Sequence, residues 1–220
     1  MKNLSQGIIK FDHDKNFRYE DFYISKSNKH VMNLLNEWPN WEKNFINING
    51  ERFSGKTHLI NIFLNKNKGI KIEANQLNEE TLKNIKNFKN VVLENLDLNI
   101  DEKLLYTLIN IIDLEEKYLI VTSIKPIVNI NFKLDDLKSR AKNFILQNIE
   151  KPDDELVYAL ILKNLSDRQI LLDKKLINFI VKRVGRSYKR ILDFIYKIDE
   201  TSLKKRKPID FKIIKDVLGE

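Results

Sequence analysis

Apolar residues in the first two thirds of the chain form short continuous runs that alternate with runs of helical spacing. The continuous runs predict buried strands, and the spaced runs between them predict helices. Strands are predicted at residues 45–48, 69–73, 90–93 and 118–123, and helices at residues 28–38, 58–64, 79–88 and 101–114. This alternation is typical of an α/β sandwich, in which a parallel sheet has helices on both faces.

The pattern changes after about residue 150, because apolar residues keep helical spacing and no further strand is predicted between them. Pro152 and the acidic residues after it are typical of a helix start, where carboxylates favour the positive end of the helix dipole. The spaced apolar residues are Leu156, Leu160, Leu176, Phe179, Ile180, Val184, Ile191, Ile195 and Ile198. We therefore predict a tail at residues 1–16, an α/β domain at 17–150 and a small α-helical domain at 151–220.

Composition narrows the chemistry that the chain can perform. The 220 residues are 42% hydrophobic, which is enough to bury a sizeable core. The absence of cysteine excludes disulfides, thiolate zinc sites and cysteine nucleophiles, and three scattered histidines do not favour a histidine metal centre. No segment approaches the roughly 18 apolar residues of a membrane helix, and the first residues lack a signal-peptide pattern. We therefore expect no membrane contact and a cytoplasmic location.

The formal net charge of +8 would suit a polyanionic partner such as nucleic acid. Lysine is interleaved with aspartate and glutamate on most segments, however, as on any solvated face. Only KKRKP, residues 204–208, is a concentrated basic run, and a loop between two helices explains it. We expect DNA contact to be indirect or non-specific.

The segment GERFSGKT, residues 50–57, lies between a predicted strand and a predicted helix. It fits G-x-x-x-x-G-K-[ST], whose glycines let backbone N–H groups surround a phosphate at a helix N-terminus. In this pattern the lysine reaches the outer phosphates and the hydroxyl of Thr57 binds Mg²⁺. The sequence therefore predicts a P-loop that binds ATP or ADP. The residues assigned to it are Gly50, Ser54, Gly55, Lys56, Thr57 and His58.

The strand end VVLEN, residues 91–95, is the candidate for the acidic partner of the P-loop. Glu94 takes the position on the metal side, although aspartate is usual there, and Asp97 is the alternative if the strand runs longer. Asn95 follows where many ATPases carry a carboxylate that activates water, and an amide cannot accept that proton. We expect hydrolysis by this chain alone to be slow or absent. An ordinary strand that ends in polar residues is the structural alternative.

These segments resemble the AAA+ module of the bacterial replication initiator DnaA, and more closely the Hda-type regulators, short DnaA homologues that inactivate the initiator. GERFSGKTHL resembles the Walker A motif of that family, VVLEN its Walker B motif and LIVTS its sensor 1 strand. YEDFYISKSN resembles its entry motif, DLKSR its arginine-finger segment, and IEKPDDELVYALI with FIVKRVGRSYKRIL its lid. The resemblance covers residues 17–218 and implies a P-loop AAA+ αβα sandwich followed by a small α-helical lid domain.

The resemblance implies roles for further residues. Arg140 in DLKSR corresponds to the arginine finger, which reaches a neighbour's nucleotide and offsets charge on its phosphates. An ion pair with Asp135 or Asp136 is the structural alternative. Ile124 occupies the usual acidic position of sensor 1, with Thr122 or Ser123 as weak substitutes, which again argues for poor self-hydrolysis.

Two further regions of the nucleotide site follow from the same resemblance. Gapless alignment places Lys189 at sensor 2 of the lid, with Arg190 one residue on, and a shift of one residue turns a helical side chain by about 100°. Only one of the two can therefore face the nucleotide, and an exposed basic pair is the alternative. Tyr23 and Ile24 would help to enclose adenine, although both would serve equally as core residues.

The initiators of this family carry a helix-turn-helix DNA-binding domain after the lid, whereas this sequence ends at Glu220. The regulators carry an N-terminal peptide that binds the sliding clamp, and QGIIKF, residues 6–11, resembles it. Gln6 would supply the hydrogen-bonding amide, and Ile9 and Phe11 the apolar anchors. Gly7 and Lys10 depart from the usual leucine and proline. Packing of this segment on its own domain is the alternative.

The resemblance as a whole implies a nucleotide-binding regulator of replication initiation. Its expected partners are the initiator DnaA and the DNA polymerase sliding clamp, and a homo-oligomer remains open. It would dock on the clamp and offer Arg140 in trans to ATP held by the initiator. A DnaA-like adaptor or helicase loader is one alternative, and a self-hydrolysing AAA+ ATPase is another.

Overall fold

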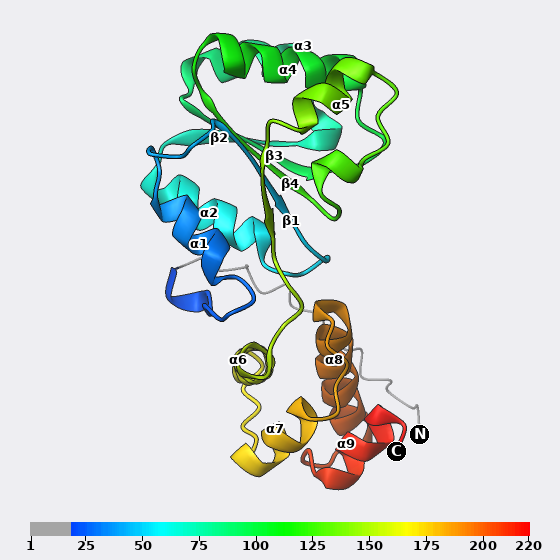
Figure 1. The fold of residues 1–220 in the computed structure, drawn as a ribbon. Helices are drawn as coiled ribbons and strands as arrows, with labels where there is room; N and C mark the ends of the chain where they lie inside the picture. The colour runs from blue at the N-terminus through cyan, green and yellow to red at the C-terminus, as the bar shows by residue number, and fades with distance from the viewer. Residues whose placement is uncertain (1–18) are drawn as a thin grey trace, which may run out of the picture.

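The computed structural model describes residues 19–220, so the predicted tail at residues 1–16 lies outside the described residues. The centre of the fold is a five-stranded sheet in the order β2-β3-β4-β1-β5, and all of its strand pairs are parallel (Figure 1). The strands are β1 (Phe45–Asn49), β2 (Gly69–Glu73), β3 (Asn90–Leu96), β4 (Tyr118–Ser123) and β5 (Ile145–Asn148). The predicted parallel sheet is confirmed.

Helices cover both faces of this sheet (Figure 1). Successive residues of a strand point to opposite faces, so Val91 and Leu93 of β3 pack into one apolar cluster and Val92 into another. The first cluster lies under α3 (Glu79–Asn84), α4 (Glu102–Leu114) and α5 (Asp135–Ala141), and the second under α1 (Lys29–Asn36) and α2 (Lys56–Lys66). Short 3₁₀ helices complete this part at η1 (Tyr19–Asp21), η2 (Ala74–Gln76), η3 (Ile85–Asn87) and η4 (Ile127–Asn129).

The structure differs from the sequence-based elements in several places, among them α5, which was not predicted as a helix. The helix predicted at residues 79–88 ends at Asn84, and η3 follows it. Strand β3 runs three residues beyond its predicted end, with a bulge between Leu93 and Leu96 where Asn95 has a φ of 60°. Strand β5 was not predicted, because its four residues alternate between half-buried and exposed positions and form no apolar run.

The C-terminal part of the chain is α-helical, as predicted. It consists of α6 (Asp154–Ser166), α7 (Lys174–Val181), α8 (Tyr188–Lys205) and α9 (Phe211–Leu218). Asp153, Asp173 and Asp210 precede three of these helices, and each accepts a hydrogen bond from a backbone N–H of the first turn. An aspartate at this position stabilises a helix start by about 1 kcal/mol. These helices bury a separate apolar core, which includes Val157, Ile180 and Ile195.

The helical part contacts the sheet part close to the end of β1. Leu156 of α6 and Tyr188 of α8 belong to the same apolar cluster as residues of α1 and α2. The hydroxyl of Tyr188 donates to the carbonyl of Glu150, and the hydroxyl of Ser27 donates to the carboxylate of Asp153. The backbone N–H of Tyr188 also donates to the carboxylate of Glu51, so the start of α8 is held next to the loop that follows β1.

A buried asparagine in β1 joins two strands and the loop after β4. The amide nitrogen of Asn47 donates to the carbonyl of Val121 and to the hydroxyl of Ser123, and its amide oxygen accepts from the backbone N–H of Ile127. Asn47 has no solvent exposure. A buried polar group of this kind stabilises the fold only while its partners remain in place.

We predict that Asn47→Ala lowers the free energy of unfolding by about 2–4 kcal/mol, because three hydrogen bonds are lost and the N–H of Ile127 is left buried without an acceptor. Urea titration of wild type and variant measures this difference. Asn33→Ala is the matched control, because Asn33 lies exposed on α1. Equal effects of the two substitutions would contradict the structural role of Asn47.

Candidate nucleotide-binding site

The loop at residues 50–55 connects the carboxyl end of β1 to the start of α2, the edge of a parallel sheet where ligands bind. Gly55 is the residue before α2 and has a φ of 92°, a conformation that glycine adopts without strain. A Cβ atom at Gly55 would lie 3.0 Å from the ring of Phe22, and one at Gly50 would lie 3.0 Å from the hydroxyl of Ser54. Both glycines are therefore needed for this tight path of the backbone.

The ammonium group of Lys56 lies inside the loop. It donates to the carbonyl oxygens of Gly50 and Glu51 at 2.8 and 2.7 Å, and it contacts the hydroxyl of Ser54 at 3.5 Å. Burial lowers the pKa of Lys56 from 10.5 to about 8, although the charges of Glu94 and Glu51 partly oppose this shift. The side chain is thus still mostly protonated at neutral pH. A buried cation held by neutral carbonyl oxygens is suited to an anionic ligand such as a phosphate.

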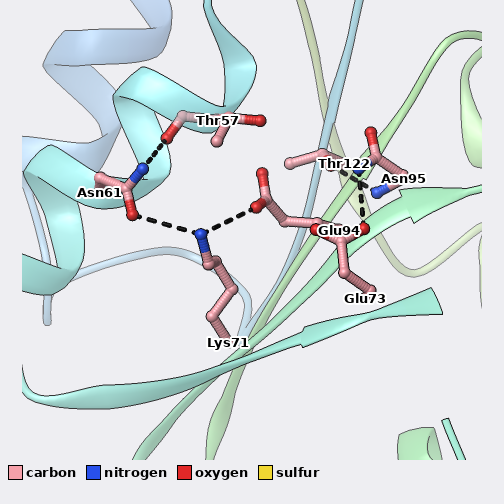
Figure 2. A network of polar contacts seen from close by, with 7 residues as sticks. All are labelled: Thr57, Asn61, Lys71, Glu73, Glu94, Asn95 and Thr122. Carbon is pink, nitrogen blue, oxygen red and sulfur yellow. Dashed lines mark hydrogen bonds and ion pairs between the residues drawn. The ribbon is translucent and has the colours of Figure 1, made fainter. Parts of the chain in front are cut away.

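Glu94 lies at the end of β3 and is almost fully buried, with 1% of its surface exposed. One of its carboxylate oxygens lies 3.3 Å from the ammonium of Lys71 on β2, and the other has no hydrogen-bond partner. Lys71 also contacts the amide oxygen of Asn61 at 3.4 Å, and Asn61 donates to the carbonyl of Thr57 (Figure 2). These residues link the end of β3 to the first turns of α2.

This arrangement does not match the magnesium ligands predicted from the sequence. Glu94 already pairs with a cation, and among residues 19–220 no group of three histidine, aspartate or glutamate residues could hold a metal ion. Thr57 is half-buried at the start of α2, and its carbonyl accepts from Asn61. The assignment of Mg²⁺ to Thr57 and Glu94 stays a prediction, and the ion pair of Glu94 with Lys71 is the contact that argues against it.

The backbone N–H and the side-chain amide of Asn95 are both engaged in hydrogen bonds. Its backbone N–H donates to the hydroxyl of Thr122 at 2.9 Å, and its amide nitrogen donates to the carboxylate of Glu73 at 2.8 Å (Figure 2). The positive φ of Asn95 at the bulge fits asparagine, which tolerates the left-handed region better than most residues. Asp97, the alternative acid, accepts from the N–H of Asn99 in an exposed turn.

The end of β4 offers no acid near the loop. The hydroxyl of Ser123 donates to the carbonyl of Lys125, and that of Thr122 accepts from the backbone N–H of Asn95, so both hydroxyls are engaged within the fold. Ile124, at the usual acidic position, is 52% exposed. That Thr122 or Ser123 substitutes only weakly for the acid of sensor 1 stays a prediction.

The side of the site predicted to hold adenine is open to solvent. Tyr23 and Ile24 are 46% and 37% exposed, so neither is a core residue. His58, on the first turn of α2, makes an edge contact with the ring of Phe22 at 5.1 Å between centroids. The amide of Asn28 donates to the carbonyl of Tyr23 and fixes the backbone of this segment.

The lid residues nearest to the loop differ from those predicted. Lys189 and Arg190 are both exposed at the start of α8. Tyr188 lies closer, because its backbone N–H donates to the carboxylate of Glu51 at 3.2 Å, and burial raises the pKa of its phenol. The choice between Lys189 and Arg190 as sensor 2 stays a prediction. The sequence signal for Tyr188 was its position as an aromatic residue at a helix start.

Arg140 lies on α5, on the opposite face of the sheet from α2 (Figure 1). Its guanidinium donates to the carboxylate of Asp113 on α4 at 2.7 Å, and the two side chains are 33% and 49% exposed. The predicted alternative partners were Asp135 and Asp136 on its own helix, of which Asp135 pairs with Lys138. The segment with Gln6, Ile9 and Phe11 lies outside the described residues.

Comparisons of the sequence find no matching family model and no matching curated protein. Solved structures with the same fold are found. Domain III of the replication initiation protein DnaA from Thermotoga maritima has a TM-score of 0.74 and 18% identity, over 94% of this chain and 97% of that chain. DnaA from Aquifex aeolicus bound to AMPPCP has a TM-score of 0.67 and 20% identity, over 88% and 70% of the two chains.

A third similar structure is the RuvB Holliday junction branch migration motor from Thermotoga maritima, with a TM-score of 0.62 and 12% identity over 88% of this chain and 67% of that chain. Among residues 19–220, no helix is long and apolar enough to cross a membrane. At these identities the likeness concerns the fold alone. The chain has an AAA+ fold of the DnaA type, with a parallel five-stranded sheet and a C-terminal helical part.

Proposed function

We propose that the chain binds ATP or ADP at residues 50–57 and regulates initiation of chromosomal replication through the initiator DnaA. The observation that supports nucleotide binding is the buried ammonium of Lys56, which lies inside a loop bounded by Gly50 and Gly55 at the start of α2. Phosphate oxygens can replace the carbonyl oxygens that now hold it, and they add a negative charge where burial has made the cation costly.

The chain is proposed to hold the nucleotide rather than to hydrolyse it. Asn95 occupies the position of the expected proton acceptor, and its amide is tied to Glu73. Ile124 replaces the acid of sensor 1, and the hydroxyl of Thr122 is already bonded. General-base catalysis requires a group that can take a proton from water, and an amide cannot do so at neutral pH.

Arg140 is proposed to act on a nucleotide held by the initiator. It lies on the opposite sheet face from α2, so its own loop is not the target. The ion pair with Asp113 is exposed, and such pairs contribute only about 0–1 kcal/mol. The arginine can therefore leave Asp113 at small cost, and its planar fork can meet two phosphate oxygens together.

The remaining part of the proposal concerns docking and location. Gln6, Ile9 and Phe11 are proposed to bind the sliding clamp, which would bring the chain to DNA without direct contact. We place this function in the cytoplasm. A homo-oligomer remains open.

A second candidate is a nucleotide-dependent adaptor or helicase loader that positions a partner without stimulating hydrolysis. The observation that favours it is the 2.7 Å ion pair between Arg140 and Asp113, because a structural arginine would be paired in this way. The two candidates differ in whether removal of the Arg140 guanidinium affects hydrolysis by the initiator.

We predict that Lys56→Ala weakens binding of ADP and ATP at least tenfold, or by about 1.4 kcal/mol or more, because the charge that faces the phosphates is removed. Calorimetric titration measures this affinity. Lys66→Ala is the matched control, because Lys66 lies exposed on the last turn of the same helix. Unchanged affinity of Lys56→Ala for both nucleotides would mean that the loop does not bind phosphate.

We predict that Arg140→Ala removes the stimulation of ATP hydrolysis by the initiator, because a finger supplied in trans contributes roughly 10³ to 10⁵ in rate in the GTPase cases. Phosphate release is measured with initiator, DNA-loaded clamp and this chain, each omitted in turn. Lys138→Ala is the matched control, because Lys138 makes a similar exposed ion pair on α5. Asp113→Ala should keep full stimulation, because it only frees the arginine.

Stimulation by Arg140→Ala at the wild-type rate would exclude the trans mechanism. If wild type binds nucleotide and the initiator but causes no stimulation, the adaptor function is favoured instead.

We predict that replacing Gln6, Ile9 and Phe11 together by alanine abolishes binding to the sliding clamp without a change in melting temperature. Surface plasmon resonance and thermal denaturation measure the two properties. Lys10→Ala within the same segment should retain binding, because Lys10 is neither the amide nor an apolar anchor. A fall of the melting temperature with clamp binding retained would show that the segment belongs to the fold.

A further inference from the structure

Lys71 and Glu94 form an ion pair at the position where the P-loop pattern predicts a metal ion. Glu94 is the acid at the end of β3, and the ammonium of Lys71 approaches its carboxylate from the neighbouring strand β2. We propose that Lys71 is the built-in counterion of Glu94 and takes the position of the divalent cation, so that the chain binds nucleotide without Mg²⁺. This inference rests on the proposed nucleotide binding at residues 50–57.

The burial of Glu94 makes a counterion necessary. Its side chain is 1% exposed, and an isolated buried carboxylate is strongly unfavourable. In the described residues, the ammonium of Lys71 is its ion-pair partner, and the charge of Lys56 also acts on it. The carboxylate is therefore neutralised by the chain itself, before any ligand arrives.

Lys71 is held in this position by a second contact. Its ammonium lies 3.4 Å from the amide oxygen of Asn61, whose amide nitrogen donates to the carbonyl of Thr57 (Figure 2). Asn61 lies one helical turn after Thr57 on α2. The ammonium is thus fixed between β3 and the helix that begins at the loop, which is where a countercharge for phosphates is required.

A divalent cation would compete with this ammonium. Mg²⁺ binds near-octahedral sets of oxygen ligands, usually one or two carboxylates with water and phosphate oxygens. On Glu94 it would lie close to the ammonium of Lys71, which contacts the same carboxylate, and two cations placed close together repel each other. Because Lys71 pairs with Glu94, the ammonium of Lys56 inside the loop is left to face the phosphates.

The test compares the affinity for ADP and ATP in buffers with Mg²⁺ and with EDTA, measured by calorimetric titration. For wild type we expect dissociation constants that differ by less than about twofold between the buffers, a difference below about 0.5 kcal/mol. For Lys71→Met we expect binding at least about tenfold tighter with Mg²⁺ than with EDTA, because Glu94 is then free to hold the metal. Lys71→Arg keeps a cation and should behave as wild type.

Lys68→Met is the matched control for the loss of a lysine, because Lys68 lies exposed just before β2. It should not acquire dependence on Mg²⁺. If Lys71→Met fails to fold, Glu94→Gln provides the test instead. This variant lacks the carboxylate that could hold Mg²⁺, and its affinity for nucleotide should stay independent of Mg²⁺. A wild-type affinity that falls tenfold or more in EDTA, or a loss of binding in Glu94→Gln, would overturn the inference.

A melting experiment without nucleotide separates this inference from the proposed function. Lys71→Met should lower the melting temperature, and adding Glu94→Gln should restore much of the loss, because the buried charge is then removed with its partner. Additive effects of the two substitutions would overturn the assignment of Lys71 as counterion. If Glu94→Gln restores the melting temperature of Lys71→Met but the wild-type chain binds neither ADP nor ATP, the ion pair is upheld and the proposed function is overturned.

Discussion

The placement of one cation inside a backbone loop governs the arrangement of the whole site. The ammonium of Lys56 can lie among the carbonyls of Gly50 and Glu51 only because β1 ends at Asn49 and α2 begins seven residues later, at Lys56. That path requires the positive φ of Gly55. The parallel sheet then brings the ends of β3 and β4 to the same edge, because parallel strands all finish on one side. The residues at the ends of those strands therefore lie at the same edge of the sheet as the loop.

Charge balance at this edge of the sheet underlies the proposal that the site binds nucleotide rather than hydrolyses it. Glu94 is neutralised by Lys71, and Asn95 is engaged with Glu73, so neither is positioned to accept a proton from water. The lid adds a further constraint, because the carboxylate of Glu51 accepts from the backbone N–H of Tyr188 at the start of α8. A ligand that moved Glu51 would change the contact with the lid. Glu51 therefore links the loop to the lid.

Much of the fold could be predicted from the sequence, because its strands are continuous apolar runs and its helices have clear apolar spacing. Strand β5 could not, since its alternation resembles that of a loop and its pairing with β1 is set by the sheet. The P-loop residues could also be proposed from the sequence, because they are adjacent in it. Lys71 was missed, because its contact with Glu94 depends on the register of two strands. The one sequence signal for its role was its place in the middle of a predicted strand, where a sheet covered on both faces usually has apolar residues.

The central claim is that the chain holds a nucleotide and leaves it intact. The most direct measurement is to incubate purified chain with ATP, remove free nucleotide by gel filtration, and identify the bound nucleotide over time by ion-exchange chromatography. The account predicts stoichiometric nucleotide that remains ATP, because neither Asn95 nor Ile124 can take the proton from water. A chain that elutes without nucleotide, or that converts its ATP steadily to ADP, would contradict it.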